Sequence, residues 1–163
     1  MKSQKIANLY LSVCLAVFLF CPFSQVYSQI TINTVQNFNF GTFYQGNAGG
    51  SIDISTSGSR SANGDIILMN SMSSGAQAIF EIEAPKGAVI SILGIADATL
   101  TGSNGGILTL QMGTTDLSNP FIVTAISPAL TRLQISAKLI VGDSKTSPPG
   151  LYQGTFAITL NQE

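Results

Sequence analysis

The sequence predicts an all-β fold, an immunoglobulin-like antiparallel β-sandwich of about nine or ten short strands. Apolar and polar residues alternate in many short segments, which is the period of a β-strand with one buried face. Turn-forming residues interrupt these segments roughly every 8–12 residues, a spacing typical of sandwiches. No segment after residue 28 has a helical period, so the crossover helices that parallel strands need are lacking. We therefore expect most strand pairs to be antiparallel.

Residues 1–28 predict a secretory signal peptide. Two lysines precede an apolar run from Leu9 to Phe20, and Val26-Tyr27-Ser28 supplies an acceptable cleavage site before Gln29. A retained membrane anchor over Ile6 to Phe23 is the alternative, although Pro22 ends the run. We predict a secreted, periplasmic or cell-surface protein, with one β-sandwich domain over residues 29–163 and no membrane span in that part.

The residue types left after cleavage exclude several kinds of chemistry. Both cysteines, Cys14 and Cys21, lie in the predicted signal peptide, and the chain has no histidine. Cys21 is a poor lipid-attachment residue, because the bulky Phe20 precedes it. The domain therefore lacks a disulfide, a cysteine nucleophile and any imidazole base or ligand. We expect no enzymatic activity, no catalytic residues, no cofactor and no metal site.

Charge is sparse throughout the chain. Charged residues make up 9% of it, against about 25% in ordinary globular proteins. Loss of Lys2 and Lys5 would leave five basic residues and eight acidic ones, a net charge of −3. Because no basic cluster is present, we expect no binding to nucleic acid or to an anionic membrane. A surface of small polar residues and glycine is typical of extracellular proteins that repeat or adhere.

Alternation predicts these strands in the first half of the domain: Ile30–Asn33, Phe38–Phe43 with a break at Gly41, Ser51–Thr56, Asp65–Met69 and Ala78–Ala84. Gln45–Gly50 is rich in glycine and predicts a turn. Asn63-Gly64 predicts a tight hairpin turn, because this pair accepts positive φ angles. The apolar run Asp65–Met69 predicts burial on both faces, whereas Ala78–Ala84 has one apolar and one charged face.

In the second half, the predicted strands are Val89–Leu93, a short one around Leu100, Leu108–Met112, an edge segment Phe121–Val123, Leu133–Val141 and Leu151–Leu160. The last of these is the most regular. It starts after the turn Pro148-Pro149-Gly150, because proline neither continues a helix nor donates to a sheet. We predict that it pairs with Leu133–Val141 across this turn and closes the sandwich. Such a domain would be self-complete.

Four short motifs follow one another along the chain: Asn39–Phe43, Gly49-Gly50, Gly58–Ser61 and Pro149–Phe156. Together they resemble the bacterial domain of unknown function family 4402, over essentially all of residues 29–163. That family is similar in layout to spore coat protein U and fimbrial-subunit domains, which are secreted immunoglobulin-like sandwiches. The resemblance implies an exported surface or periplasmic protein, such as a pilus or coat subunit, and no known activity. The cysteine pair of the coat and pilin groups is missing after residue 28.

Polar residues that could form a site are scattered. Glu81 and Glu83 would share one solvated face of a strand, and we expect a surface role rather than a glycosidase pair. Five aspartates offer oxygen ligands for calcium, but their single placement favours turn and surface roles: Asp53, Asp65, Asp97, Asp116 and Asp143. Arg60 should hydrogen-bond loop carbonyls or a partner carboxylate. Tyr152 should donate through its hydroxyl while its ring packs inward. Asn104–Gly106 is a turn, not a phosphate loop.

Three functional hypotheses follow. The first is a non-enzymatic structural or adhesive surface protein whose β-edges pair with other copies or with other surface subunits. In this hypothesis the apolar segment Gln29–Phe43 adds to a neighbour's edge, although its simplest role is as the domain's own first strand. The alternative is a carbohydrate- or ligand-binding module. Because the chain has no tryptophan, only Tyr44 and Phe121 are candidates for an exposed sugar platform. An enzyme is the third and weakest hypothesis.

Overall fold

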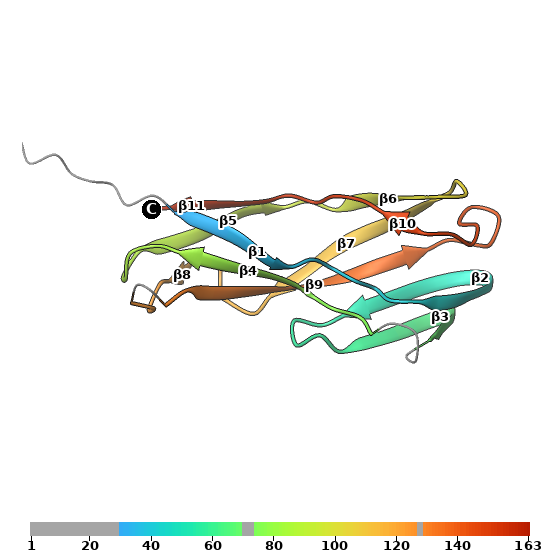
Figure 1. Ribbon diagram of the computed structural model, residues 1–163, viewed down its shortest axis with the longest axis horizontal. Coiled ribbons are helices and arrows are strands. Elements are labelled where there is room, and N and C mark those ends of the chain that lie inside the picture. The colour runs from blue at the N-terminus through green and yellow to red at the C-terminus, as the bar shows by residue number, and fades with distance from the viewer. Residues whose placement is uncertain (1–29, 70–73, 127–128) are drawn as a thin grey trace, which may run out of the picture.

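The computed structural model describes residues 30–69, 74–126 and 129–163, and its strands form two layers (Figure 1). The strands are β1 (Thr31–Gln36), β2 (Phe43–Ile54), β3 (Arg60–Leu68), β4 (Ala78–Glu83), β5 (Val89–Ile95), β6 (Ala98–Gly102), β7 (Ile107–Thr115), β8 (Phe121–Ile122), β9 (Thr131–Val141), β10 (Tyr152–Gln153) and β11 (Ile158–Gln162). Every pairing between these strands is antiparallel. The predicted all-β antiparallel sandwich is confirmed. The predicted signal peptide lies outside the described residues.

The described residues form no helix, and so they include no helix that is long and apolar enough to cross a membrane. The larger sheet has the strand order β1-β4-β9-β7-β6-β10, and the β2–β3 hairpin joins it through β9. The smaller sheet has the order β11-β5-β8. In Figure 1 the smaller sheet lies at the end of the molecule that also holds β1 and β4, whereas β2, β3 and β10 lie at the other end.

β9 is the central strand of the larger sheet. Its inward side chains are all buried, as their alternation predicts: Leu133, Ile135, Ala137, Leu139 and Val141. β7 occupies one edge of β9. β4 pairs with the first part of the other edge, over Thr131–Ile135, and β2 pairs with the last part, over Ala137–Val141. Both edges of β9 are therefore used.

Two core clusters lie on either side of the middle of β9. One cluster lies between the two sheets: Ala78, Phe80, Ile82, Ile90, Phe121, Val123, Leu133 and Ile135. The other is formed by β2, β3, β7, the end of β9 and the segment before β2: Phe40, Ile52, Ile54, Ile66, Leu108, Leu110, Ala137, Leu139 and Val141. Phe38, Met112 and Phe156 contact both clusters and connect them.

The predicted pairing of the last strand is wrong. Leu151–Leu160 is divided into β10, which pairs with β6, and β11, which pairs with β5 in the smaller sheet. It does not pair with Leu133–Val141, because β7, β4 and β2 already occupy both edges of that strand. Between β10 and β11 the chain passes close to β6, and a Cβ on Gly154 would lie 2.5 Å from the carbonyl oxygen of Thr99. The described residues contain 11 strands in all.

The glycine-rich segments of the β2–β3 hairpin have other roles than predicted. The hairpin turn lies at Ser55–Ser59, where Gly58 has a φ of 83° and its N–H donates to the Ser55 carbonyl (3.0 Å). Gln45–Gly50 lies inside β2, where residues 46–49 bulge opposite Asp65. Asn63-Gly64 lies inside β3 and pairs with β2. Glycine pairs permit bulges as readily as turns, and here they form a bulge.

Two further expectations for this region are wrong. The run Asp65–Met69 is buried on one face only, because Ile66 is buried while Ile67 is 63% exposed. Phe38–Phe43 is not a separate strand. Residues 38–42 lie in the segment that connects β1 to β2, where Asn39 makes an isolated bridge with Ala76, and Phe43 already belongs to β2. This connecting segment forms one side of the groove described next.

Candidate binding groove

A groove runs between two connecting segments that are far apart in the sequence. One wall is Asn37–Gln45, which leads from β1 into β2, and the other is Pro148–Phe156, which contains β10. Side chains of β6, β7 and β9 form the floor: Ala98, Leu100, Leu108, Leu110, Leu139 and Val141. The groove consists of two adjoining cavities of about 270 and 380 Å³, which share Phe38, Phe40 and Leu100. We call it the lateral groove.

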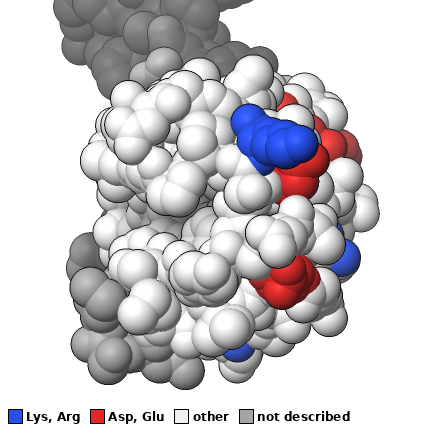
Figure 2. Space-filling view, turned by 90° about the vertical axis from the view of Figure 1, so that its right-hand side faces the viewer, with Lys and Arg blue, Asp and Glu red and all other residues white. Residues whose placement is uncertain are grey.

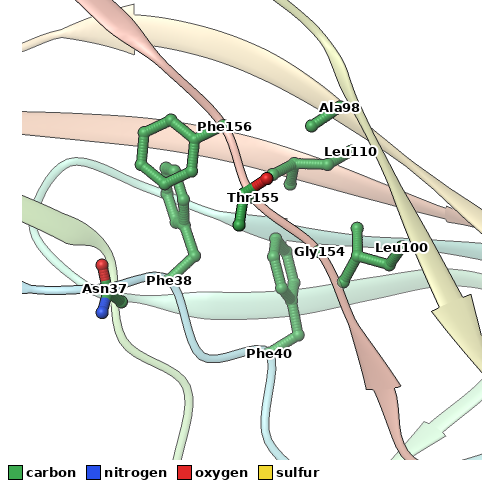
Figure 3. Close-up of a pocket in the computed structure, with 9 residues that line it drawn as sticks. All are labelled: Asn37, Phe38, Phe40, Ala98, Leu100, Leu110, Gly154, Thr155 and Phe156. Atoms are coloured by element: carbon green, nitrogen blue, oxygen red, sulfur yellow. The ribbon is translucent and has the colours of Figure 1, made fainter.

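Aromatic rings close one end of the lateral groove. Figure 3 shows Phe38 and Phe40 projecting from the first wall towards the second, with Phe156 above Phe38 and Leu100 beside Phe40. The ring centroids of Phe38 and Phe156 are 5.2 Å apart, and Phe156 meets Phe80 edge-on at 6.1 Å. These contacts fix the distance between the walls at this end, because aromatic pairs at such separations attract each other.

Hydrogen bonds hold the second wall in place. The Tyr152 hydroxyl donates to the Pro148 carbonyl at 2.6 Å, which confirms the role predicted for this tyrosine. Asn104 donates from Nδ2 to the Pro149 carbonyl at 2.7 Å, so the predicted turn at residues 104–106 supports the wall. Burial raises the pKa of the Tyr152 hydroxyl, because the charged phenolate is poorly solvated there. The preceding loop is ordered by Asp143, whose pKa is lowered by hydrogen bonds from Thr146.

Arg60 holds the first wall in place. It hydrogen-bonds a loop carbonyl, which is one of the two roles that the sequence predicted for it. Arg60 donates from Nη1 to the Phe40 carbonyl at 2.5 Å. Asn39 exchanges two backbone hydrogen bonds with Ala76, of 2.9 and 2.7 Å. At the far end, Gln45 donates from Nε2 to the Gly142 carbonyl at 2.6 Å. Hydrogen bonds therefore fix both walls to the rest of the fold.

Each wall presents an unpaired strand edge among the described residues. Over Phe43–Gln45, β2 pairs only with β3, and β10 pairs only with β6. The Met69 N–H donates to the Thr42 carbonyl, so by alternation the backbone groups of Phe43 and Gln45 point away from β3. The Ser103 N–H donates to the Leu151 carbonyl, so those of Tyr152 point away from β6.

The described lining of the lateral groove is uncharged. Among the described residues that line its two cavities, none is Asp, Glu, Lys or Arg. Figure 2 looks onto the end of the molecule that holds the β6–β7 turn and the loop after β9, and uncharged residues cover most of that face. Such a groove favours an occupant without charge on its inward side, because a buried unpaired charge is costly.

The other candidate residues do not come together. Glu81 and Glu83 lie on β4, opposite Asn33 and Thr31 of β1, as expected for a surface strand. Each aspartate has its own local contacts: Asp53 with Lys138 and Asn63, Asp65 with Ala48, Asp97 with Met112, Asp116 with Gln134, and Asp143 with Lys145 and Thr146. Within the described ranges, no three acidic side chains meet closely enough to hold a metal ion.

The two candidate sugar platforms have different outcomes. Phe121 is 5% exposed and belongs to the core between the sheets, so it cannot serve as a platform, and that expectation is corrected. Tyr44 is 61% exposed and lies beside the lateral groove. The groove itself was not predicted. Its walls nevertheless coincide with two of the four motifs, Asn39–Phe43 and Pro149–Phe156, and Arg60 of a third motif fastens one wall.

The fold defines the class of protein as an antiparallel β-sandwich with one half open at a groove. The family comparison is more specific. The model of the domain of unknown function DUF4402 matches residues 30–162, and the chain belongs to this family, as its motifs predicted. No curated protein and no solved structure matches the chain.

Proposed function

We propose that this protein is a non-enzymatic, exported structural or adhesive subunit that associates through the edges of its β-sheets. The observation that carries the proposal is the edge strand β1. It pairs with β4 alone among the described strands, and five of its six residues are exposed. Edge strands are usually protected by lysine, proline or a bulge. β1 contains neither a charged residue nor a proline, and its register shift lies near its end, between Thr34 and Gln36.

Apolar exposure on β1 adds to its tendency to associate. Ile32 is 39% exposed and Val35 is 50% exposed. The neighbouring strand β4 carries Glu81 and Glu83, so the charges lie one strand inward from the edge instead of on it. This arrangement favours pairing of β1 with another chain, because main-chain hydrogen bonds supply affinity and little charge opposes the approach.

Native protein recovered from culture tests the proposal. Light scattering after gel filtration, together with electron microscopy, should detect assemblies or filaments. Asn33→Lys should weaken association, because it places a protecting lysine on the exposed edge strand. Thr109→Lys is the matched control, because it adds the same charge to an exposed position of β7, which is paired on both sides. A native protein that stays monomeric at every concentration would contradict the proposal.

A carbohydrate- or ligand-binding module is the alternative. Tyr44 favours it, because this exposed side chain lies beside the larger cavity of the lateral groove, whose volume of about 380 Å³ is in the range of small-molecule pockets. A glycan array should then give binding that Tyr44→Ala abolishes. Absence of any bound glycan at high protein concentration would remove carbohydrate from this alternative.

A further inference from the structure

We propose that the lateral groove receives strand β1 of a second copy of this chain, so that copies join head to tail. The inference rests on the proposed function and names the surface and the segment that would meet. Its first support is the shape of the groove. An apolar floor lies between two walls, and each wall presents a strand edge that no described strand pairs with, at Phe43–Gln45 and at Tyr152. An extended chain is the occupant that can use all three features.

The direction of the walls sets the geometry of the inserted strand. Asn37 and Phe38 line the same cavity as Thr155 and Phe156, whereas Thr42–Gln45 line the same cavity as Pro148–Leu151. The walls therefore run in opposite chain directions. A strand between them is antiparallel to one wall and parallel to the other, and both kinds of pairing are available to β-strands. Its alternate side chains point to the floor, which is apolar.

Charge identifies β1 as the strand that fits. The groove lining is uncharged, and the segment Ile30–Gln36 is uncharged and has isoleucine at positions 30 and 32, two residues apart. β3 and β4 carry charged residues, and β9 is held on both edges. β11 is uncharged, but two of its side chains, Ile158 and Leu160, pack against the core between the sheets, whereas Ile30 alone does so in the segment Ile30–Gln36.

Release of β1 from β4 costs less free energy than release of a strand that is paired on both edges or packed into the core. Five of its six residues are exposed, and of the described strands it pairs with β4 alone. In the groove of a second copy it would pair along two edges. The exchange uncovers one edge, that of β4, and covers the two edges that flank the groove, so the pairing lost at β4 is replaced by pairing with the backbone groups of Phe43, Gln45 and Tyr152. Donor strand and acceptor groove are different surfaces, so the contact is heterologous and can repeat into an open chain.

A charge at the rim of the groove provides the first test. Leu151 lines the groove and is 66% exposed, so Leu151→Arg should fold normally while placing a cation where β1 enters. Leu93, also 66% exposed, lies on β5 in the smaller sheet and gives the matched control Leu93→Arg. We expect Leu151→Arg to lower the association constant at least about tenfold and Leu93→Arg to leave it unchanged. Equal thermal unfolding midpoints show that both variants are folded.

Photo-crosslinking identifies the occupant and tolerates any register. Benzoylphenylalanine is introduced at position 151, or at position 93 as the control, and crosslinked dimers are digested and mapped by mass spectrometry. The groove at position 151 should capture residues 30–36 of the second copy, and position 93 should not. If assemblies form but the crosslinks map elsewhere, or if Leu151→Arg assembles like wild type, this inference is wrong while the proposed function stands. If the unaltered protein never assembles, both are wrong.

Discussion

The two halves of the sandwich differ in how they are covered. In the half that contains β1, β4 and the start of β9, the smaller sheet lies over the core, and Ile82, Leu133 and Ile135 are 0% exposed. In the half that contains β2, β6, β10 and the end of β9, no second sheet lies over the described residues, and two connecting segments flank a groove instead. Complete burial stabilises both halves, since Ile52 and Ile54 of the open half are 0% and 1% exposed, but among the described residues a second sheet closes only the covered half. The open half keeps unpaired edges and apolar surface, which are the features of a binding site.

Truncation of a core leucine should separate the two halves most clearly. Leu133→Ala removes a side chain with 0% exposure from the covered half, and it should lower the free energy of unfolding by about 2–5 kcal/mol. Leu100→Ala alters the floor of the lateral groove, where the side chain is partly buried, and should cost less than about 2 kcal/mol. Urea unfolding measures both. Equal losses would contradict the distinction between a covered half and an open half.

Gly154 tests how closely the second wall passes over β6. A Cβ at this position would lie 2.5 Å from the Thr99 carbonyl oxygen, so Gly154→Ala should destabilise the fold by about 1–3 kcal/mol. Gly94→Ala on β5 is the control, because a Cβ there meets nothing within 4 Å. We expect that variant to be neutral or slightly stabilising. Similar thermal midpoints for the two variants would mean that the wall is not packed on β6.

Removal of the Tyr152 hydroxyl should have the smallest effect. Tyr152→Phe loses the hydrogen bond to the Pro148 carbonyl and should cost about 0.5–1.5 kcal/mol. Burial raises the pKa of Tyr152 above its ordinary value of 10.0, so the folded state favours the protonated form. The stability that the protonated Tyr152 side chain contributes is fully present below pH 10.0 and is lost as the pH rises through the pKa of the folded state.

The measurement for this prediction is urea unfolding as a function of pH. The stability of the wild type should decline at alkaline pH, and Tyr152→Phe should remove part of that decline. Tyr44→Phe is the control, because the Tyr44 side chain is 61% exposed. If both substitutions alter the alkaline profile equally, the hydroxyl of Tyr152 has no special role in the second wall.

Local patterns predicted the covered half well and the open half poorly. The alternation in β9 and β4 gave the correct buried faces, because each of these strands stays in one sheet along its length. The alternation in Leu151–Leu160 continues while the chain leaves one sheet for the other, so a regular period did not reveal the division into β10 and β11. Periodicity reports which face is buried but not which strand is the neighbour.

The candidate site was predictable only in part. Arg60 and Tyr152 were expected to hydrogen-bond backbone carbonyls, and both do. Their joint purpose, to hold two walls around a groove, depends on segments more than 100 residues apart that no local pattern connects. The motifs Asn39–Phe43 and Pro149–Phe156 pointed to the right residues. Only the fold places them on opposite sides of one groove.

Amide hydrogen exchange tests the central claim, that the open half is completed by β1 of another copy, most directly. In the monomer, the N–H groups of Phe43, Gln45 and Tyr152 should exchange rapidly, because they lie on edges that no described strand pairs with. In the assembled protein they should become protected, while amides of β4 that face β1 lose protection. Unchanged exchange at all three wall positions, in protein shown by light scattering to be assembled, would contradict the account.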